Sequence, residues 1–359
     1  MPRAIVAALI LLFLSCTTAL CATITVTNTN DSGAGSLRQA ISDASSGDTI
    51  NFSVTGTITL TTGDLAIAEN LTISGPGAEN LAIDGNASDR IFTIASGYTI
   101  NISDLTIANG YADPWGGGIE NEATLNLTDC VVENCSANGK GNGYGGGLDN
   151  CGGTVTITRC TFRNNTATNE GGAIAGYSGS ITIIDSTIEN NTSDNGGGIS
   201  QYNAATLTLN RCTVSGNHAT AGSSKNGGGI ICKAGSLTLT NCTISGNDAD
   251  NGGGIKDGTS AASTINIVNC TIVNNTAVDR GGGIEFNETT ANIKNTILAA
   301  NTAPSGANFY DSESGGLNSQ GYNLSDGTLA AFSGTGDQTG ATLNMAALAD
   351  NGGSIQTHE

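Results

Sequence analysis

Residues 227–247 read GGGIICKAGSLTLTNCTISGN, and the order of residue types in this stretch decides the fold. A Gly-Gly pair with an aliphatic residue comes first, an alternating segment ending in a small residue follows, and a short segment ending in Asn completes the unit. Seven copies of this unit, each about 25 to 31 residues long, run from Gly116 to Asn301. A period of this length is typical of a solenoid, in which each repeat must stack on its neighbours to bury its apolar face.

Aligning the copies on the small residue gives two apolar columns two residues apart, which is the period of a strand with one buried face. The residues beside these columns carry hydroxyl or amide groups and are expected to face water. The pattern predicts a parallel β-helix whose rungs stack in register at about 4.8 Å. The two columns are Leu125, Val155, Ile181, Leu207, Leu237, Ile265 and Ala291, and Leu127, Ile157, Ile183, Leu209, Leu239, Ile267 and Ile293.

One Asn recurs at the same corner of successive copies. Identical amides stacked at one corner predict a ladder, in which each side chain hydrogen-bonds to its counterparts in the rungs above and below. The predicted ladder residues are Asn165, Asn191, Asn217, Asn247, Asn275 and Asn301.

The small-residue column is mostly cysteine, with Ser186 and Thr296 at two positions. This mixture is typical of buried packing by a small, soft side chain, so we expect stacked free thiols. Neighbouring rungs also bring such residues within disulfide range, which leaves a bond between adjacent members open. The column contains Cys130, Cys160, Cys212, Cys242 and Cys270.

Charged residues alternate in sign along two further columns. Opposite charges on neighbouring strands favour one register, and we interpret them as pairing devices worth about 1 kcal/mol or less each. If the protein is an enzyme, the same residues are its candidate catalytic groups. They are Asp129, Arg159, Asp185, Arg211, Arg163 and Glu189.

The chain carries signs of export. Residues 1–21 form the pattern of a secretory signal peptide, with a short apolar run from Ala4 to Leu14 and a cleavage position after Cys21. Cys16 loosely fits a lipoprotein box. A formal net charge of −19 with 12 Lys plus Arg argues against nucleic acid and anionic membranes as partners. We expect no integral membrane segment and no cofactor, with calcium left open because it takes oxygen ligands.

The regular repeats occupy residues 116–303. Residues 22–115 are expected to hold an N-terminal cap and the first rungs, because Ser36 and Gln39 form a capping-box pattern that opens a short helix over the end of the β-helix. Residues 304–359 lack the repeat, and we expect an irregular, truncated segment there.

Several motifs resemble known bacterial surface proteins. FRNN at residues 162–165 followed by GGAI at 171–174 resembles the polymorphic outer membrane protein repeats. SLRQAI at 36–41, with GYNL at 321–324 and DNGG at 350–353, resembles the proteins called choice-of-anchor Q. The resemblance implies an all-β, single-stranded, right-handed parallel β-helix that is secreted or displayed at the cell surface or outer membrane of a bacterium.

An exported, noncatalytic protein with an adhesion, display or structural role is the main expectation. The chain lacks the motifs of pectin hydrolases, and its repeat arginines are already matched with acids, whereas hydrolysis needs two facing carboxylates and elimination needs a base. A polysaccharide lyase or glycoside hydrolase acting on acidic glycans is the alternative. Ice binding by the outward Thr and Ser columns is a minor one, because Ile184, Val268 and Lys294 interrupt the array.

Aromatic residues near the first glycine turns are candidate contacts for a glycan or a cell-surface protein. Such rings also pack against neighbouring loops, so both interpretations stay open, as does the oligomeric state. The residues are Tyr111, Trp115, Tyr144 and Tyr177.

Overall fold

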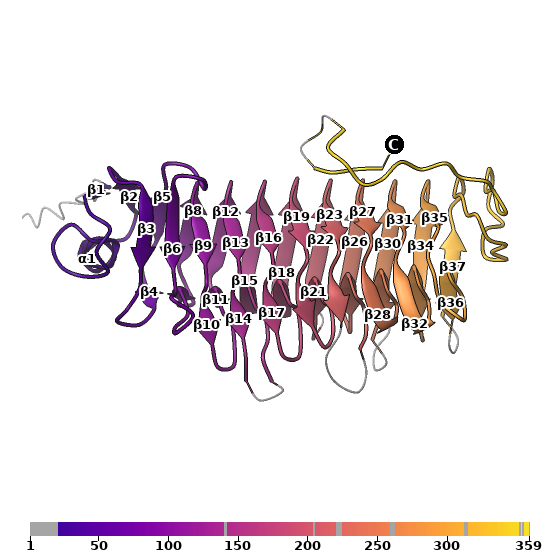
Figure 1. The fold of residues 1–359 in the computed structure, drawn as a ribbon, viewed down its shortest axis with the longest axis horizontal. Helices are drawn as coiled ribbons and strands as arrows, with labels where there is room; N and C mark the ends of the chain where they lie inside the picture. The colour runs from indigo at the N-terminus through magenta and orange to yellow at the C-terminus, as the bar shows by residue number, and fades with distance from the viewer. Residues whose placement is uncertain are drawn as a thin grey trace, which may run out of the picture.

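The computed structural model describes residues 21–139, 142–203, 205–219, 225–258, 263–311, 315–351, 353 and 355–358. Over these residues the chain forms a rod of about 11 stacked turns of parallel strands, which confirms the predicted right-handed β-helix (Figure 1). Most of the expected signal peptide, Cys16 included, lies outside the described residues. No helix within the described ranges combines the length and apolar character needed to cross a membrane.

Three parallel sheets run along the rod. The first contains β1 Thr23–Val26, β2 Asp48–Phe52, β4 Leu65–Ile67, β5 Leu71–Ser74, β7 Phe92–Ile94, β8 Thr99–Ser103, β11 Ile119–Asn121, β12 Thr124–Thr128, β15 Leu148–Thr158, β18 Ile174–Ile184, β21 Ile199–Gln201, β22 Thr206–Asn210, β25 Ile230–Cys232, β26 Ser236–Thr240, β29 Ile255–Asp257, β30 Thr264–Val268, β33 Ile284–Phe286, β34 Thr290–Lys294, β36 Phe309–Asp311 and β37 Gly316–Ser319. The second contains β3 Gly56–Thr59, β6 Leu81–Asp84, β9 Thr106–Ala108, β13 Val131–Glu133, β16 Thr161–Arg163, β19 Thr187–Glu189, β23 Thr213–Ser215, β27 Thr243–Ser245, β31 Thr271–Val273 and β35 Ile297–Ala299. The third contains β10 Tyr111–Ala112, β14 Ser136–Ala137, β17 Thr166–Ala167, β20 Thr192–Ser193, β24 His218–Ala219, β28 Asp248–Asn251 and β32 Thr276–Arg280.

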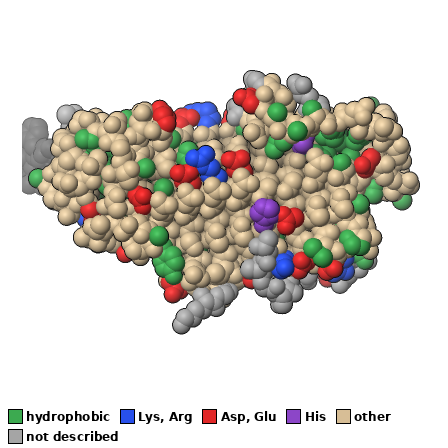
Figure 2. Space-filling model, viewed as in Figure 1, with side chains coloured by type: hydrophobic (Ala, Val, Ile, Leu, Met, Phe, Trp, Pro, Cys, Tyr) green, Lys and Arg blue, Asp and Glu red, His purple; other side chains and the backbone are tan. Residues whose placement is uncertain are grey.

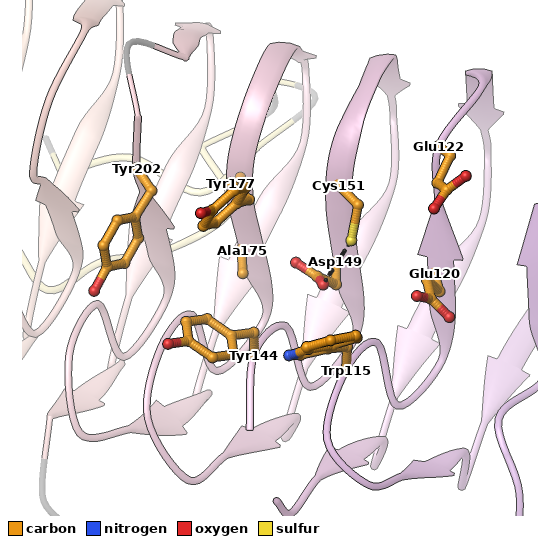
Figure 3. Close-up of a pocket in the computed structure, with 10 residues that line it drawn as sticks. Trp115, Glu120, Glu122, Tyr144, Asp149, Cys151, Ala175, Tyr177 and Tyr202 are labelled. Carbon is orange, nitrogen blue, oxygen red and sulfur yellow. Dashed lines mark hydrogen bonds between the residues drawn. The ribbon is translucent and has the colours of Figure 1, made fainter. Parts of the chain in front are cut away.

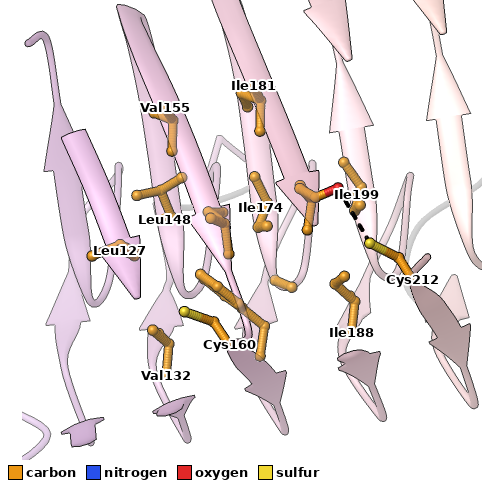
Figure 4. Close-up of a cluster of buried hydrophobic side chains, with 14 of the residues drawn as sticks. Leu127, Val132, Leu148, Val155, Cys160, Ile174, Ile181, Ile188, Ile199 and Cys212 are labelled. Atoms are coloured by element: carbon orange, nitrogen blue, oxygen red, sulfur yellow. Dashed lines mark hydrogen bonds between the residues drawn. The ribbon is translucent and has the colours of Figure 1, made fainter. Parts of the chain in front are cut away.

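The core is a stack of aliphatic side chains inside the coil (Figure 4). The two predicted apolar columns are buried and paired in register, as in Leu127 opposite Ile157 and Ile157 opposite Ile183. The hydroxyl and amide residues between them point outward, because successive residues of a strand face opposite sides. Stability is therefore shared along the stack, since each rung buries its apolar residues against the next.

Glycine turns connect the third sheet to the first. The first glycine of each turn has a positive φ, +62° at Gly145 and +64° at Gly227, which side chains rarely tolerate. The second glycine lies against the neighbouring rung, where a Cβ on Gly146 would come within 2.3 Å of the Gly172 carbonyl oxygen. The Gly-Gly motif therefore allows successive rungs to stack closely at this corner.

The recurrent asparagines hydrogen-bond along the rod. Asn217 Nδ2 donates to Asn247 Oδ1 at 3.0 Å, and its own Oδ1 accepts from Asn191 Nδ2 at 2.9 Å. Members of the cysteine column are buried and free, and Cys212 Sγ donates to the Ile183 carbonyl oxygen at 3.3 Å. Both columns thus satisfy backbone or side-chain polar groups inside the corners of the coil.

The helix α1 Leu37–Asp43 covers the N-terminal end, where it contacts β1 and β4. Ser36 caps it by accepting from the Gln39 backbone N–H at 3.2 Å. Gln39 does not complete the reciprocal capping box, because its side chain donates to Asp43 instead. Leu37 and Ala40 are buried, so the helix shields the first rungs from water.

The segment after residue 303 begins with two further strands. β36 and β37 continue the first sheet by pairing with β33 and β34. The chain then runs back along the rod over the second sheet (Figure 1). There Thr213 Oγ1 donates to the Gln356 carbonyl oxygen at 2.7 Å, and the Ser245 hydroxyl contacts His358 Nε2 at 2.8 Å.

Candidate functional site

Two columns of side chains flank the glycine turns. We call the residues that precede the glycines the pre-glycine column and the residues that follow the aliphatic position the post-turn column. Unlike the core columns, both contain several residue types, although the pre-glycine column ends in three asparagines. The pre-glycine column is Trp115, Tyr144, Glu170, Asn195, Asn226 and Asn251. The post-turn column is Glu120, Asp149, Ala175, Ser200, Ile231, Lys256 and Glu285.

A groove lies along these columns. Its first part has a volume of about 440 Å³, its second about 340 Å³, and they share Tyr202. Figure 3 shows the first part, where rings and carboxylates from successive rungs gather on one side of the coil. The first part is lined by Trp115, Glu120, Glu122, Tyr144, Asp149, Cys151, Ala175, Gly176, Tyr177 and Tyr202, and the second by Tyr202, Asn203, Asn226, Ile231, Lys233, Ala234, Lys256, Asp257 and Gly258.

Aromatic rings form the walls of the first part. The Tyr177 and Tyr202 rings are stacked with centroids 6.2 Å apart, and Tyr144 meets Tyr202 edge-on at 6.4 Å. Trp115 is 46% exposed and Tyr177 is 53% exposed, so large apolar faces are open to a ligand. A sugar ring offers C–H groups that pack on such faces, while the Tyr and Trp polar atoms bond its hydroxyls.

Two carboxyl groups lie on neighbouring rungs of the groove, Glu120 in β11 and Asp149 in β15. The pKa of Asp149 is raised to about 7, mainly by burial and to a lesser extent by the charge of nearby Glu120, while a hydrogen bond from the Cys151 thiol at 3.1 Å opposes the rise. Glu120 forms an ion pair with Arg90 at 2.6 Å. Near neutral pH the Asp149 carboxyl is therefore partly protonated, and it lies one rung from a second carboxyl group that is held by a cation, an arrangement that acid–base catalysis can use.

A second cluster occupies the middle of the groove. Glu170 is buried, and it accepts from the Ser200 hydroxyl at 2.5 Å, from the Tyr202 hydroxyl at 3.1 Å and from Lys233. Burial raises the pKa of Glu170, and the Lys233 charge works against that rise. Lys233 Nζ also donates to the Tyr202 hydroxyl at 2.8 Å and lies 4.6 Å from the ring centroid. These contacts fix the Tyr202 ring at the junction of the two parts.

The structure brings three of the four predicted aromatic contacts into the groove, namely Trp115, Tyr144 and Tyr177. Tyr111 belongs to β10 and does not line it. No group of three or more His, Cys, Asp or Glu residues within the described ranges is arranged to hold a metal ion.

The candidate catalytic residues from the charge columns lie elsewhere. Arg159 pairs with Asp129 and Arg211 with Asp185, each at 2.6 Å, and the arginines are about half exposed. Arg163 pairs with Glu133 at 2.6 Å and, with Glu189, lines a shallow hollow under the C-terminal segment. On the face in Figure 2, Lys and Arg side chains lie beside Asp or Glu, as such pairs require. The structure therefore shows Arg159, Arg163 and Arg211 in ion pairs outside the groove, and it places Glu189 outside the groove as well.

Sequence reasoning missed Glu120, Asp149, Glu170, Tyr202 and Lys233. For Glu120, Asp149 and Glu170 the available signal was the change of residue type within the two columns beside the repeated glycine turn, whereas Tyr202 and Lys233 lie outside both columns. The core columns repeat one residue type, aliphatic, on every rung. The pre-glycine and post-turn columns instead carry an aromatic residue, a carboxylate or a lysine on particular rungs.

Solved structures with a similar fold include two lyases and an epimerase. The A-module of mannuronan C-5 epimerase AlgE4 from Azotobacter vinelandii is 15% identical, with a TM-score of 0.45 over 81% of this chain and 86% of that chain. Pectate lyase Pel9A is 11% identical, with a TM-score of 0.41 over 80% and 78%. The PL6 family alginate lyase AlyGC is 14% identical, with a TM-score of 0.44 over 94% and 55%.

These comparisons contradict the main expectation of a noncatalytic adhesion, display or structural protein, because the similar structures are named as lyases and an epimerase. They agree better with the alternative that the sequence left open, an enzyme that cleaves polysaccharides. At these identities the likeness is one of fold, and any activity has to be derived from the groove itself.

No curated protein sequence matches the chain. A family model described as right-handed beta helix region matches residues 144–323, which is half of the chain. The matched residues include β15 to β37 and with them most of the groove. The chain therefore belongs to the right-handed β-helix family.

Proposed function

We propose that the protein cleaves glycosidic bonds of a polysaccharide held in the groove, with Asp149 as the general acid. The observation that carries this proposal is the pair of neighbouring carboxyl groups, Asp149 with a pKa of about 7 and Glu120 in an ion pair, beside open aromatic faces. Two carboxyl groups with different protonation are the minimum equipment for glycoside hydrolysis.

The reaction follows from the positions of the two groups. The Asp149 carboxyl transfers its proton to the oxygen of the leaving sugar as the glycosidic bond breaks. Glu120 takes a proton from the water that attacks the anomeric carbon, so each cleavage consumes one water and leaves one new reducing end. The Cys151 thiol then stabilises the Asp149 carboxylate through its hydrogen bond until the proton returns.

The groove positions the polysaccharide and the Glu120 carboxylate. Adjacent rungs are about 4.8 Å apart, so Trp115, Tyr144 and Tyr177 offer apolar faces at successive steps along the rod. Arg90 holds Glu120 in place and also donates to the carbonyl oxygens of Trp115 and Gly116, which couples the carboxylate to the aromatic wall. Because binding holds the substrate next to the catalytic acid, part of the activation free energy is offset by the binding free energy.

Elimination at a uronate, the reaction of a polysaccharide lyase, is the second candidate. The contact of Lys233 with the Tyr202 hydroxyl favours it, because the cation can neutralise the sugar carboxylate while the phenol relays the proton lost from the neighbouring carbon to the leaving oxygen. Burial raises the pKa of Tyr202, so its hydroxyl stays protonated at neutral pH.

A product analysis tests both reactions. The purified protein is incubated with neutral and acidic polysaccharides, with and without calcium, and followed for new reducing ends and for unsaturated sugars. Hydrolysis gives reducing ends without unsaturation, whereas elimination gives both. Absence of new ends on every polymer, under conditions where Trp115 fluorescence shows binding, would overturn the proposal.

We further propose that the chain is exported and belongs to the choice-of-anchor Q or polymorphic outer membrane repeat proteins. The support is the apolar run before Cys21 and the motifs FRNN at 162–165, SLRQAI at 36–41 and GYNL at 321–324. Expression with the native N-terminus should give mature protein outside the cytoplasm that begins at Ala22. A product that keeps Met1 and stays in the cytoplasm would contradict this.

A further inference from the structure

The cation nearest the carboxyl pair is largely engaged within the protein. Arg90 Nη1 contacts Glu120 at 2.6 Å and the Thr93 hydroxyl at 2.8 Å. Its Nε donates to the Gly116 carbonyl oxygen at 3.0 Å, and its Nη2 donates to that of Trp115 at 2.7 Å. Four of the five guanidinium N–H groups therefore have an acceptor in the protein, which leaves one on Nη2 for a ligand and no bidentate site for an anion.

The two lysines of the groove are matched in the same way. Lys233 forms an ion pair with the buried Glu170 and donates to the Tyr202 hydroxyl. Lys256 is buried and pairs with the buried Glu285 at 3.0 Å. Separating Lys233 from Glu170 would leave a buried carboxylate without its cation, which is strongly unfavourable. The Lys256 partner Glu285 is held by Arg280 as well, at 3.3 Å.

The first part of the groove carries surplus acid instead. Glu122 is exposed at the rim and forms no ion pair within the described residues. Glu120 has a single cation, and Asp149 becomes a further negative charge once it has given up its proton. A sugar carboxylate placed here would face like charges at short range in a partly enclosed site.

We infer that the groove takes a neutral polysaccharide, recognised by its sugar faces and hydroxyls, and disfavours the acidic glycans that the alternative interpretation of the sequence named. Trp115 and Tyr177 bind the C–H face of a sugar whether or not the polymer is charged. Glu122, exposed at the rim of the groove, can accept hydrogen bonds from sugar hydroxyls. This inference rests on the proposed function, since it names the substrate class of that groove.

Binding can be measured directly, because Trp115 is the single tryptophan of the chain and lines the groove. The full chain carrying Asp149→Asn, which mimics the protonated acid, is titrated with cellohexaose, mannohexaose and xylohexaose, and with hexagalacturonate and hexamannuronate. The uronates are tested in EDTA and in calcium. We expect at least one neutral hexasaccharide to bind tenfold or more tightly than either uronate. A uronate that binds as tightly as the best neutral probe, in either condition, would overturn the inference.

A matched pair of variants tests the electrostatic cause. Glu122→Gln in the same background should tighten uronate binding about threefold or more and leave neutral binding nearly unchanged. Asp279→Asn removes an exposed carboxylate outside the groove and should change neither. Equal responses to the two variants would show that charge inside the groove does not set the preference.

The outcomes separate this inference from the proposed function. Cleavage of a uronate polymer with preferred uronate binding would overturn the neutral substrate class and leave glycan cleavage standing. Tight binding of a neutral probe with no cleavage of any polymer would keep the substrate class and overturn the catalytic proposal.

Discussion

The thiol of Cys151 lies 3.1 Å from Oδ2 of Asp149, on the same strand and two residues away. Residues i and i+2 of a regular strand share a face, and here both side chains line the groove. The contact matters because a thiol that donates to a carboxylate stabilises the ionised form, against the burial that favours the protonated one. Cys151 is thus placed to tune the proposed acid.

Asp149→Asn should remove most of the activity. An amide keeps the shape of the protonated carboxyl but cannot give up a proton, and general acids contribute roughly 10²- to 10⁴-fold to rate. We expect kcat to fall by about that factor with a small change in KM. The measurement is initial rate of reducing-end formation on the best polymer.

Asp129→Asn is the matched control for that variant. Asp129 makes an exposed ion pair with Arg159 outside the groove, so its loss should leave kcat within about twofold. A large loss of activity in Asp129→Asn with normal activity in Asp149→Asn would move the catalytic role to the charge column.

The rate should fall as pH rises through about 7, because Asp149 must be protonated to act. Cys151→Ala removes the hydrogen bond that favours the carboxylate, so the alkaline limb of the kcat profile should move to higher pH. Cys151→Ser supplies a stronger donor and should move that limb to lower pH. A limb that stays in place in both variants would show that Cys151 does not act through Asp149.

The titration of Asp149 should also make the free energy of unfolding depend on pH. The folded-state pKa of Asp149 is raised from 3.8 to about 7, so between these values the folded chain keeps a proton that the unfolded chain releases. The free energy of unfolding therefore falls as pH rises through this window, by up to roughly 4 kcal/mol. Below pH 4 Asp149 causes no such decrease in the free energy of unfolding, and above pH 8 the decrease has reached its full size.

Urea unfolding of the wild type and Asp149→Asn at pH 4 and pH 8 checks this sign. The variant should gain stability relative to the wild type at pH 8 and lose that advantage at pH 4. Glu170 also has a raised pKa, but it titrates in both proteins and cancels in the comparison. A larger advantage for the variant at pH 4 would contradict the assignment.

The sequence predicted the coil because its structural columns repeat one residue type at one spacing. Leu127, Ile157 and Asn217 were each identified by such repetition, and each lies where the pattern placed it. Asp149 was missed because its column mixes carboxylates with Ala175, Ser200, Ile231 and Lys256 and so shows no repeated residue type. Its raised pKa also depends on Glu120 and Cys151 and on burial between rungs, which no local pattern encodes.

The asparagine column should contribute stability that a surface asparagine does not. Asn217 is fully buried, and its Nδ2 donates to the Ile188 carbonyl oxygen at 2.9 Å as well as to Asn247. Asn217→Ala removes the acceptor of the Asn191 backbone N–H at 3.0 Å and the side-chain donor to the Ile188 carbonyl oxygen, at about 1 to 3 kcal/mol each. We expect the free energy of unfolding to drop by about 3 kcal/mol, seen as a lower urea midpoint.

Asn126→Ala provides the comparison, because the Asn126 amide donates to Asn101 Oδ1 at 2.9 Å on the outer face, where water can replace the lost partner. Its urea midpoint should change by an amount equivalent to about 0.5 kcal/mol or less. Equal losses in the two variants would mean that the buried amides are no more than packing residues. A loss confined to Asn217→Ala would show that the corner amides hold neighbouring rungs together, since only buried groups lack water as a substitute partner.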